Sequence, residues 1–91
     1  MRKIERKLFV LNDQIAALLR DEELARGELD FHRHLHDDAA RDAAASDHPL
    51  DRSDARDTGL DVARFERHID DLRKSRERLE RQRDRLLAKL D

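Results

Sequence analysis

Residues 31–42, FHRHLHDDAARD, carry three histidines at alternate positions that run into two aspartates. Imidazole and carboxylate groups bind transition metals, and a histidine also changes its charge near neutral pH. Successive residues of an α-helix are rotated by about 100°, so His32 and His36 share one face while His34 lies roughly opposite. The segment therefore offers two histidines at the i, i+4 spacing of a zinc site, and a further ligand has to come from elsewhere in the chain.

The elements that position these histidines follow from the apolar residues, which recur at alternating steps of four and three. Such steps from Ile4 to Ala43 meet nine apolar residues in twelve positions, and from Val62 to Leu90 seven in nine. We call these positions the seam, because this repeat is typical of helices that pack side by side. With 46% charged and 3% aromatic residues, the chain has too little apolar volume for a thicker core. The predicted fold is all-α, an antiparallel two-helix coiled-coil hairpin.

The predicted hairpin is a single domain, residues 1–91, with one loop. The segment SDHPLDRSDARDTG, residues 46–59, contains the only proline and several helix-capping residue types, so it is predicted as the tip loop. The first helix then spans about residues 2–45 and the second about 60–90, with Asp57, Thr58 or Asp61 capping its start. Gly27 lies within the first helix, where a kink or break is an open alternative.

These bounds make the first helix longer than the second, roughly 66 Å against 45 Å at 1.5 Å per residue. Facing residues then have numbers that sum to about 105–108, which places Leu90 near Ile15 or Leu18. The open end of the hairpin is left with apolar residues that lack a partner within the chain, and exposed apolar surface of this kind marks an interface. We expect self-association there, most simply as a two-fold homodimer, through Ile4, Leu8, Phe9, Leu11 and Ile15.

The same register brings His68 and Asp71 near His36, which gives a candidate metal set of His32, His36, His68 and Asp71. The interpretation that we favour is a polar seam layer that fixes the register of the two helices, so no metal and no cofactor is expected. The arginines at seam positions fit this interpretation. Arg76 is predicted to pair with Glu28 or Asp30, and Arg83 with Glu22 or Glu23.

Several classes of function lack the residues they need. There is no cysteine, no phosphate-binding glycine loop and no nucleophile with a neighbouring base, so we expect no enzymatic activity. The longest apolar run is Ile15 to Leu19, five residues, against the roughly 20 residues that cross a bilayer, and no secretory signal is recognisable. We expect a cytoplasmic protein that does not bind membranes. Arginines between Arg73 and Arg85 alternate with acids and have no aromatic neighbours, which argues against nucleic-acid binding.

Charge is distributed unevenly along the chain. Residues 1–20 carry a net charge of +3, residues 72–91 carry +4, and residues 21–71 carry −9. A hairpin would bring the two basic segments together at its open end and leave the acids at its tip. The tip residues expected to face a partner are Asp47, Asp51, Arg52, Asp54 and Asp57.

Within this tip, the stretch PLDRSD resembles the coiled-coil tip of the DksA/TraR family, whose members carry a spaced pair of aspartates followed by alanine. Asp51 matches the second acid and Asp47 or His48 the place of the first; alternatively, Asp51 and Asp54 form the pair, with Arg56 in place of alanine. The resemblance implies a transcription modulator whose acidic tip enters the secondary channel of RNA polymerase. It covers the tip alone, and the family's zinc-binding cysteines are absent.

Three candidate functions therefore come from the sequence. The first is a non-enzymatic coiled-coil module for protein interaction and oligomerisation, with an unidentified protein partner. The alternative is a transcription modulator that places its acidic hairpin tip in the secondary channel of RNA polymerase, and the second alternative is a helical protein that binds a metal through histidine and aspartate.

Overall fold

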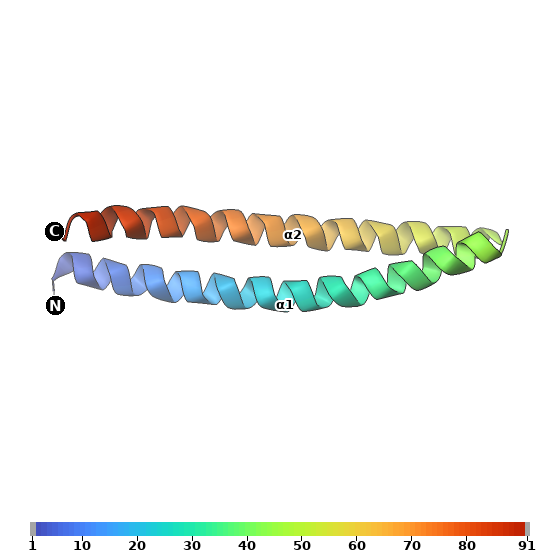
Figure 1. Ribbon diagram of the computed structural model, residues 1–91, viewed down its shortest axis with the longest axis horizontal. Coiled ribbons are helices and arrows are strands. Elements are labelled where there is room, and N and C mark those ends of the chain that lie inside the picture. The colour runs from blue at the N-terminus through green and yellow to red at the C-terminus, as the bar shows by residue number, and fades with distance from the viewer. Residues whose placement is uncertain (1, 91) are drawn as a thin grey trace. The chain divides into compact units, whose positions relative to one another are not determined.

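The computed structural model describes residues 2–90 and consists of two α-helices (Figure 1). Helix α1 spans Lys3–Ala45 and helix α2 spans Pro49–Ala88. They divide into two compact units, in each of which α1 packs against α2: unit 1 is Met1–Glu23 with Asp70–Asp91, and unit 2 is Leu24–Ile69. The predicted all-α helical hairpin is confirmed.

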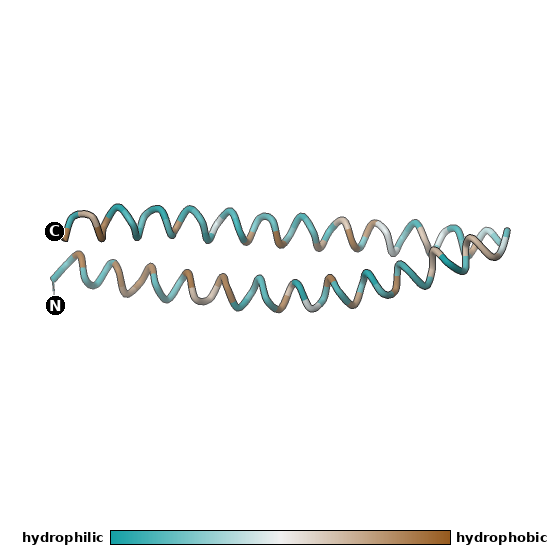
Figure 2. The backbone as a smooth tube through the Cα atoms, in the orientation of Figure 1, coloured by the Kyte–Doolittle hydropathy of each residue, from teal (hydrophilic) through white to brown (hydrophobic). Residues whose placement is uncertain are grey.

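The seam predicted from the heptad steps forms the contact between the helices in both units. Leu11 and Ile15 are buried in unit 1, and Ala25 and Leu29 in unit 2. Every predicted seam residue from Ile4 to Leu86 is at least partly buried, whereas most residues between them are exposed. Apolar residues accordingly recur at short intervals between hydrophilic ones along both helices (Figure 2). Burial of this stripe is the main stabilising term, since helices this polar gain little from propensity alone.

The connection between the helices is shorter than predicted. Residues 46–59 were expected to form a loop, but α2 begins at Pro49 and only residues 46–48 lie between the helices. His48 precedes the helix, and its Nδ1 accepts a hydrogen bond from the Leu50 amide at 3.1 Å. The amide of His48 in turn donates to Ser46 Oγ at 3.1 Å. The N-cap is therefore His48, and the expected caps Asp57, Thr58 and Asp61 lie inside the helix.

Local residue preferences explain why the acidic segment is helical. Proline suits the first helical position, because its φ angle is already helical and its missing N–H would have no partner there. The carboxylate of Asp51, in the first turn, favours the positive end of the helix dipole. The steps of four and three also continue backward from Val62 through Thr58, Ala55 and Asp51, all partly buried. The seam thus extends through the segment that its composition suggested was a loop.

The shorter connection changes which residues face each other. The Arg76 guanidinium contacts Glu22 in unit 1, and in unit 2 the His32 ring lies on Phe65 while His36 bonds to Thr58. The numbers of these facing residues sum to between 94 and 98. The predicted sums of 105–108 are wrong, because a loop centred on residue 47 replaces one centred between residues 52 and 53. Consequently the predicted length difference is also wrong, since the helices have 43 and 40 residues.

Gly27 does not interrupt α1, which is helical from Lys3 to Ala45. Neither helix has a stretch apolar enough to cross a lipid bilayer within the residues that the structure describes.

Candidate interaction surfaces

A charged cluster lies within the seam of unit 1. Glu22 is completely buried, and its two carboxylate oxygens accept hydrogen bonds from Arg76 Nε at 2.5 Å and Nη2 at 3.1 Å. Arg76 Nη1 donates to Glu80 Oε1 at 2.7 Å. The carboxylates hold the proton on Arg76 and raise the pKa of its guanidinium, chiefly through the bonds to Glu22. This bidentate pair fixes one relative position of the two helix segments.

Arg76 was predicted to pair with an acid of the first helix, and it does so with a different partner, Glu22. Arg76 contacts neither Glu28 nor Asp30 because the register is shifted, and Arg83 donates to the adjacent Asp84 at 3.3 Å rather than to Glu22 or Glu23. The Glu22–Arg76 pair has a structural role, since its two charged groups bond to each other within the seam.

The histidines at seam positions make ring contacts and a hydrogen bond in unit 2. The His32 ring stacks on Phe65 with 4.6 Å between ring centroids and meets Phe31 edge-on at 5.6 Å. His36 Nδ1 donates to Thr58 Oγ1 at 3.0 Å, and Thr58 donates to the Asp54 carbonyl at 2.8 Å. The His36 ring also lies against Gly59, where a Cβ atom would come within 3.2 Å of His36 Cε1. His32 and His36 therefore pack against α2 as parts of the seam.

The predicted metal set is not assembled. His68 lies ten residues beyond Thr58, about 15 Å farther along α2 than the residue that His36 contacts. Asp71 belongs to the other unit. His34 is exposed, and its Nδ1 donates to the Asp30 carbonyl at 2.8 Å. Within residues 2–90, no three His, Asp or Glu side chains are arranged to hold a metal ion.

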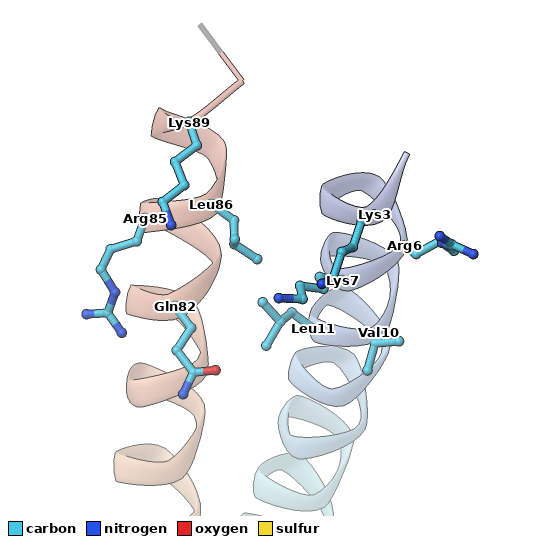
Figure 3. Close-up of a pocket in the computed structure, with 9 residues that line it drawn as sticks. All are labelled: Lys3, Arg6, Lys7, Val10, Leu11, Gln82, Arg85, Leu86 and Lys89. Carbon is cyan, nitrogen blue, oxygen red and sulfur yellow. The ribbon is translucent and has the colours of Figure 1, made fainter. Parts of the chain in front are cut away.

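A groove opens between the two helices of unit 1 near their ends. Its volume is about 800 Å³. The side chains of Leu11 and Leu86 point toward each other between the helices and form its apolar floor (Figure 3). Lys7 extends between the helices toward α2, while the side chains of Arg6 and Arg85 point away from this space, on the outer sides of α1 and α2 (Figure 3). None of the lining residues is acidic: Lys3, Arg6, Lys7, Val10, Leu11, Gln82, Arg85, Leu86 and Lys89. We call this surface the basic groove.

A smaller groove of about 310 Å³ lies in unit 2 and has the opposite charge. Leu35 and Ala39 of α1 supply its apolar part, and Leu35 remains 41% exposed. Five carboxylates surround this apolar part, and no basic residue is among the lining residues. Besides Leu35, Ala39 and Thr58, the lining comprises Asp38, Asp42, Asp51, Asp54 and Asp57. We call this surface the acidic groove.

The residues predicted for partner binding at the tip are divided by the helical conformation of the segment. Asp51, Asp54 and Asp57 line the acidic groove together. Asp47 lies in the connection, and Arg52 is exposed on α2 outside the groove.

The residues predicted for self-association are also divided. Leu11 and Ile15 are only 8% and 5% exposed, because α2 extends far enough to cover them. The expectation that Leu11 lacks a partner within the chain is therefore wrong, and Ile15 is not available for self-association in this structure. Ile4 and Leu8 are partly buried. Phe9 remains 59% exposed and Val10, beside it, 56%.

The arginine-rich part of α2 forms ion pairs within the helix, as its spacing predicted. Arg73 donates to Asp70 and to Glu77, and Lys74 lies 2.9 Å from Asp70. The hydrogen bonds that Arg73 and Lys74 donate to Asp70 lower the pKa of its carboxyl group, and the bonds that Arg73 donates to Asp70 and Glu77 raise the pKa of its own guanidinium. These bases are engaged along the helix surface, whereas no ion pair between residues 2 and 90 is formed by the bases of the basic groove.

Sequence reasoning missed the groups that line each groove together. It identified a basic open end but not Lys7, Arg85 and Lys89 as one surface, and it did not include Asp38 and Asp42 with the tip acids. The signal was present, since residues next to seam positions on facing helices flank the same groove once the register is known.

No protein-family model matches the sequence, and neither a curated protein nor a solved structure shows significant similarity to it.

Proposed function

We propose that this chain is a non-catalytic, cytoplasmic helical-hairpin module that associates with other protein surfaces. The observation that carries the proposal is the basic groove, in which an apolar floor is bordered by bases from both helices. Apolar contact supplies affinity, and charge of one sign selects a partner of the other. The two grooves of opposite charge make the module able to engage acidic surfaces through unit 1 and basic surfaces through unit 2.

The seam contacts support this proposal in a second way. Glu22 and Arg76 use their charges on each other, and His36 bonds to Thr58. The chemical groups left for a partner are therefore the exposed ones, above all the groove charges and large apolar side chains such as Leu24 and Phe31, which are 67% and 60% exposed. Within the grooves themselves, exposed apolar side chains lie beside charges, as in protein interfaces: Val10 is 56% exposed in the basic groove and Leu35 41% exposed in the acidic groove.

Affinity capture with matched variants tests the proposed function. The immobilised wild-type chain should retain a defined set of proteins from a cell extract, and Lys7→Glu/Arg85→Glu should lose part of that set because acidic partners are repelled. The control variant Arg78→Glu/Arg81→Glu makes the same change of charge at exposed positions outside the groove. Quantitative mass spectrometry that finds the same proteins on all three chains would contradict an interaction role for the groove.

A second candidate function is the polymerase-channel role implied by the tip resemblance. It is favoured by one observation: Asp51 and Asp54 lie on the same groove one helical turn apart, close to the connection between the helices. An in vitro transcription assay should show an effect of the wild-type chain that Asp51→Asn/Asp54→Asn removes. The control Glu28→Gln/Asp37→Asn alters exposed acids elsewhere in unit 2, and equal activity of both variants would reject this function.

A further inference from the structure

We infer that the basic groove of one copy binds the acidic groove surface of a second copy, which joins unit 1 of one molecule to unit 2 of another. This inference rests on the proposed function and names a second copy of the chain as the partner of the basic groove. The charges match in number as well as in sign. Five bases line the basic groove, and five carboxylates line the acidic groove.

The apolar parts of the two surfaces add to the complementarity. Leu11, Leu86 and Val10 line the basic groove, and Leu35 and Ala39 line the acidic one. Contact would remove Val10 and Leu35, which are 56% and 41% exposed, from water. An apolar centre with a charged rim is the usual arrangement of a specific protein interface. A purely polar occupant such as a nucleic-acid backbone would leave this apolar part without a partner.

Charge also decides between this contact and a two-fold contact at the open end. A two-fold contact places the same surface of both copies together, so the bases of the groove would face one another. Unit 1 as a whole carries 13 bases and 11 acids, while unit 2 carries 7 bases and 11 acids. Association of unit 1 with unit 2 therefore reduces repulsion, whereas association of unit 1 with unit 1 increases it.

The stoichiometry follows from the type of contact. A contact between two different surfaces leaves one free surface of each kind on every pair, so copies continue to add unless the assembly closes into a ring. The mass should therefore rise beyond that of a dimer as the protein concentration increases. Because the groove charges are exposed, salt should weaken the association, with a Debye length of about 10 Å at 0.1 M and 3 Å at 1 M.

Sedimentation velocity of the full chain, with two triple variants, tests this contact. The basic-groove variant is Lys7→Gln/Arg85→Gln/Lys89→Gln, and the acidic-groove variant is Asp51→Asn/Asp54→Asn/Asp57→Asn. Each alone should self-associate at least about tenfold more weakly than wild type, because charge pairs across the contact are lost. A 1:1 mixture of the two should form a heterodimer and nothing larger, since one intact basic groove and one intact acidic groove remain per pair.

Matched controls change the same number of charges outside the grooves. They are Arg20→Gln/Arg78→Gln/Arg81→Gln in unit 1 and Glu28→Gln/Asp37→Asn/Glu66→Gln in unit 2, and both should associate as wild type does. Circular dichroism establishes that each variant is helical. Should a triple variant fail to fold, the single charge reversals Lys7→Glu and Asp54→Lys, both at exposed positions, provide the same mixing test.

Three results would overturn the inference: a wild-type chain that stays monomeric at all concentrations, a mixture that forms no heterodimer, or a basic-groove variant that associates more strongly than wild type. The last is the result that a two-fold contact at the open end predicts. Failure of this inference can be told apart from failure of the proposed function. If the chain is monomeric but its capture of other proteins still depends on Lys7 and Arg85, self-association alone is refuted.

Discussion

The leucines at positions 24 and 29 provide a direct test of which face of α1 stabilises unit 2. Both lie in the same helix and the same unit, five residues apart, yet Leu29 is 6% exposed in the seam while Leu24 is 67% exposed. Replacing either by alanine removes the same three carbon atoms. The two substitutions therefore differ in burial and in little else.

The expected magnitudes follow from that difference. Burial of a methylene group contributes about 0.8 kcal/mol, so Leu29→Ala should lower the free energy of unfolding by about 2 kcal/mol. A contact between only two helices can partly close around the lost volume, so the additional cavity term should be small. Leu24→Ala loses about a third as much burial and gains slightly in helix propensity, so its cost should be about 0.5 kcal/mol.

Thermal and urea unfolding followed by circular dichroism measures both values. For a chain of this size 2 kcal/mol corresponds to a fall of about 10 °C in Tm. The protein should be kept dilute, so that association does not add to the apparent stability. If Leu24→Ala proved as costly as Leu29→Ala, the outer face of α1 would be buried in the folded species, and the assignment of the seam as the stabilising contact would be refuted.

Three further predictions concern the Glu22–Arg76 pair, the two glycines and the loss of stability at low pH. Arg76→Leu should lower Tm more than Glu22→Leu/Arg76→Leu, because the single change removes two hydrogen bonds from a buried carboxylate; equal Tm values would contradict this. Gly27→Ala should stabilise the chain by about 1 kcal/mol, and Gly59→Ala by less, because its Cβ would crowd His36; unfolding in urea measures both. Neighbouring cations lower the pKa of Asp70 in the folded chain. Its small contribution to the free energy of unfolding is therefore present above the pKa of the unfolded state, about 3.9, and is lost as the pH falls through the lower pKa of the folded state. Asp70→Asn should therefore lose less helicity than wild type on acidification below about pH 4, and identical titrations would reject that contribution.

The fold was predictable because the seam repeats many times in the sequence. From Ile4 to Leu86 each step of four or three falls on a residue that the structure buries at least partly, even where that residue is Glu22, His36 or Arg76. A repeat of this length determines which face of each helix is buried, whatever the identity of single residues. The hairpin then follows from having two such stripes in a chain with few residues that permit a turn.

The ends of the elements were less predictable, because composition and periodicity disagreed in residues 46–59. Proline, serine and aspartate are frequent in loops, but the same residue types begin helices, and here His48 and Pro49 start α2. The backward steps to Thr58, Ala55 and Asp51 carried the correct information. They are hard to recognise in the sequence because a polar or small residue at a seam position contributes little apolar signal, although Thr58 makes the contact with His36.

The start of α2 at Pro49 determines which residues line the grooves. In an antiparallel hairpin the connection sets which residues face each other, so moving eleven residues from the loop into α2 shifts every facing pair by about eleven positions. With the shift, Arg76 meets Glu22, Leu86 meets Leu11, and the apolar open end predicted from unequal helices becomes a groove lined by bases from both. The partner expected at the open end changes with it. Unpartnered leucines at the open end favoured a two-fold dimer, whereas Lys7 and Arg85 on one groove oppose it and favour an acidic surface as the partner.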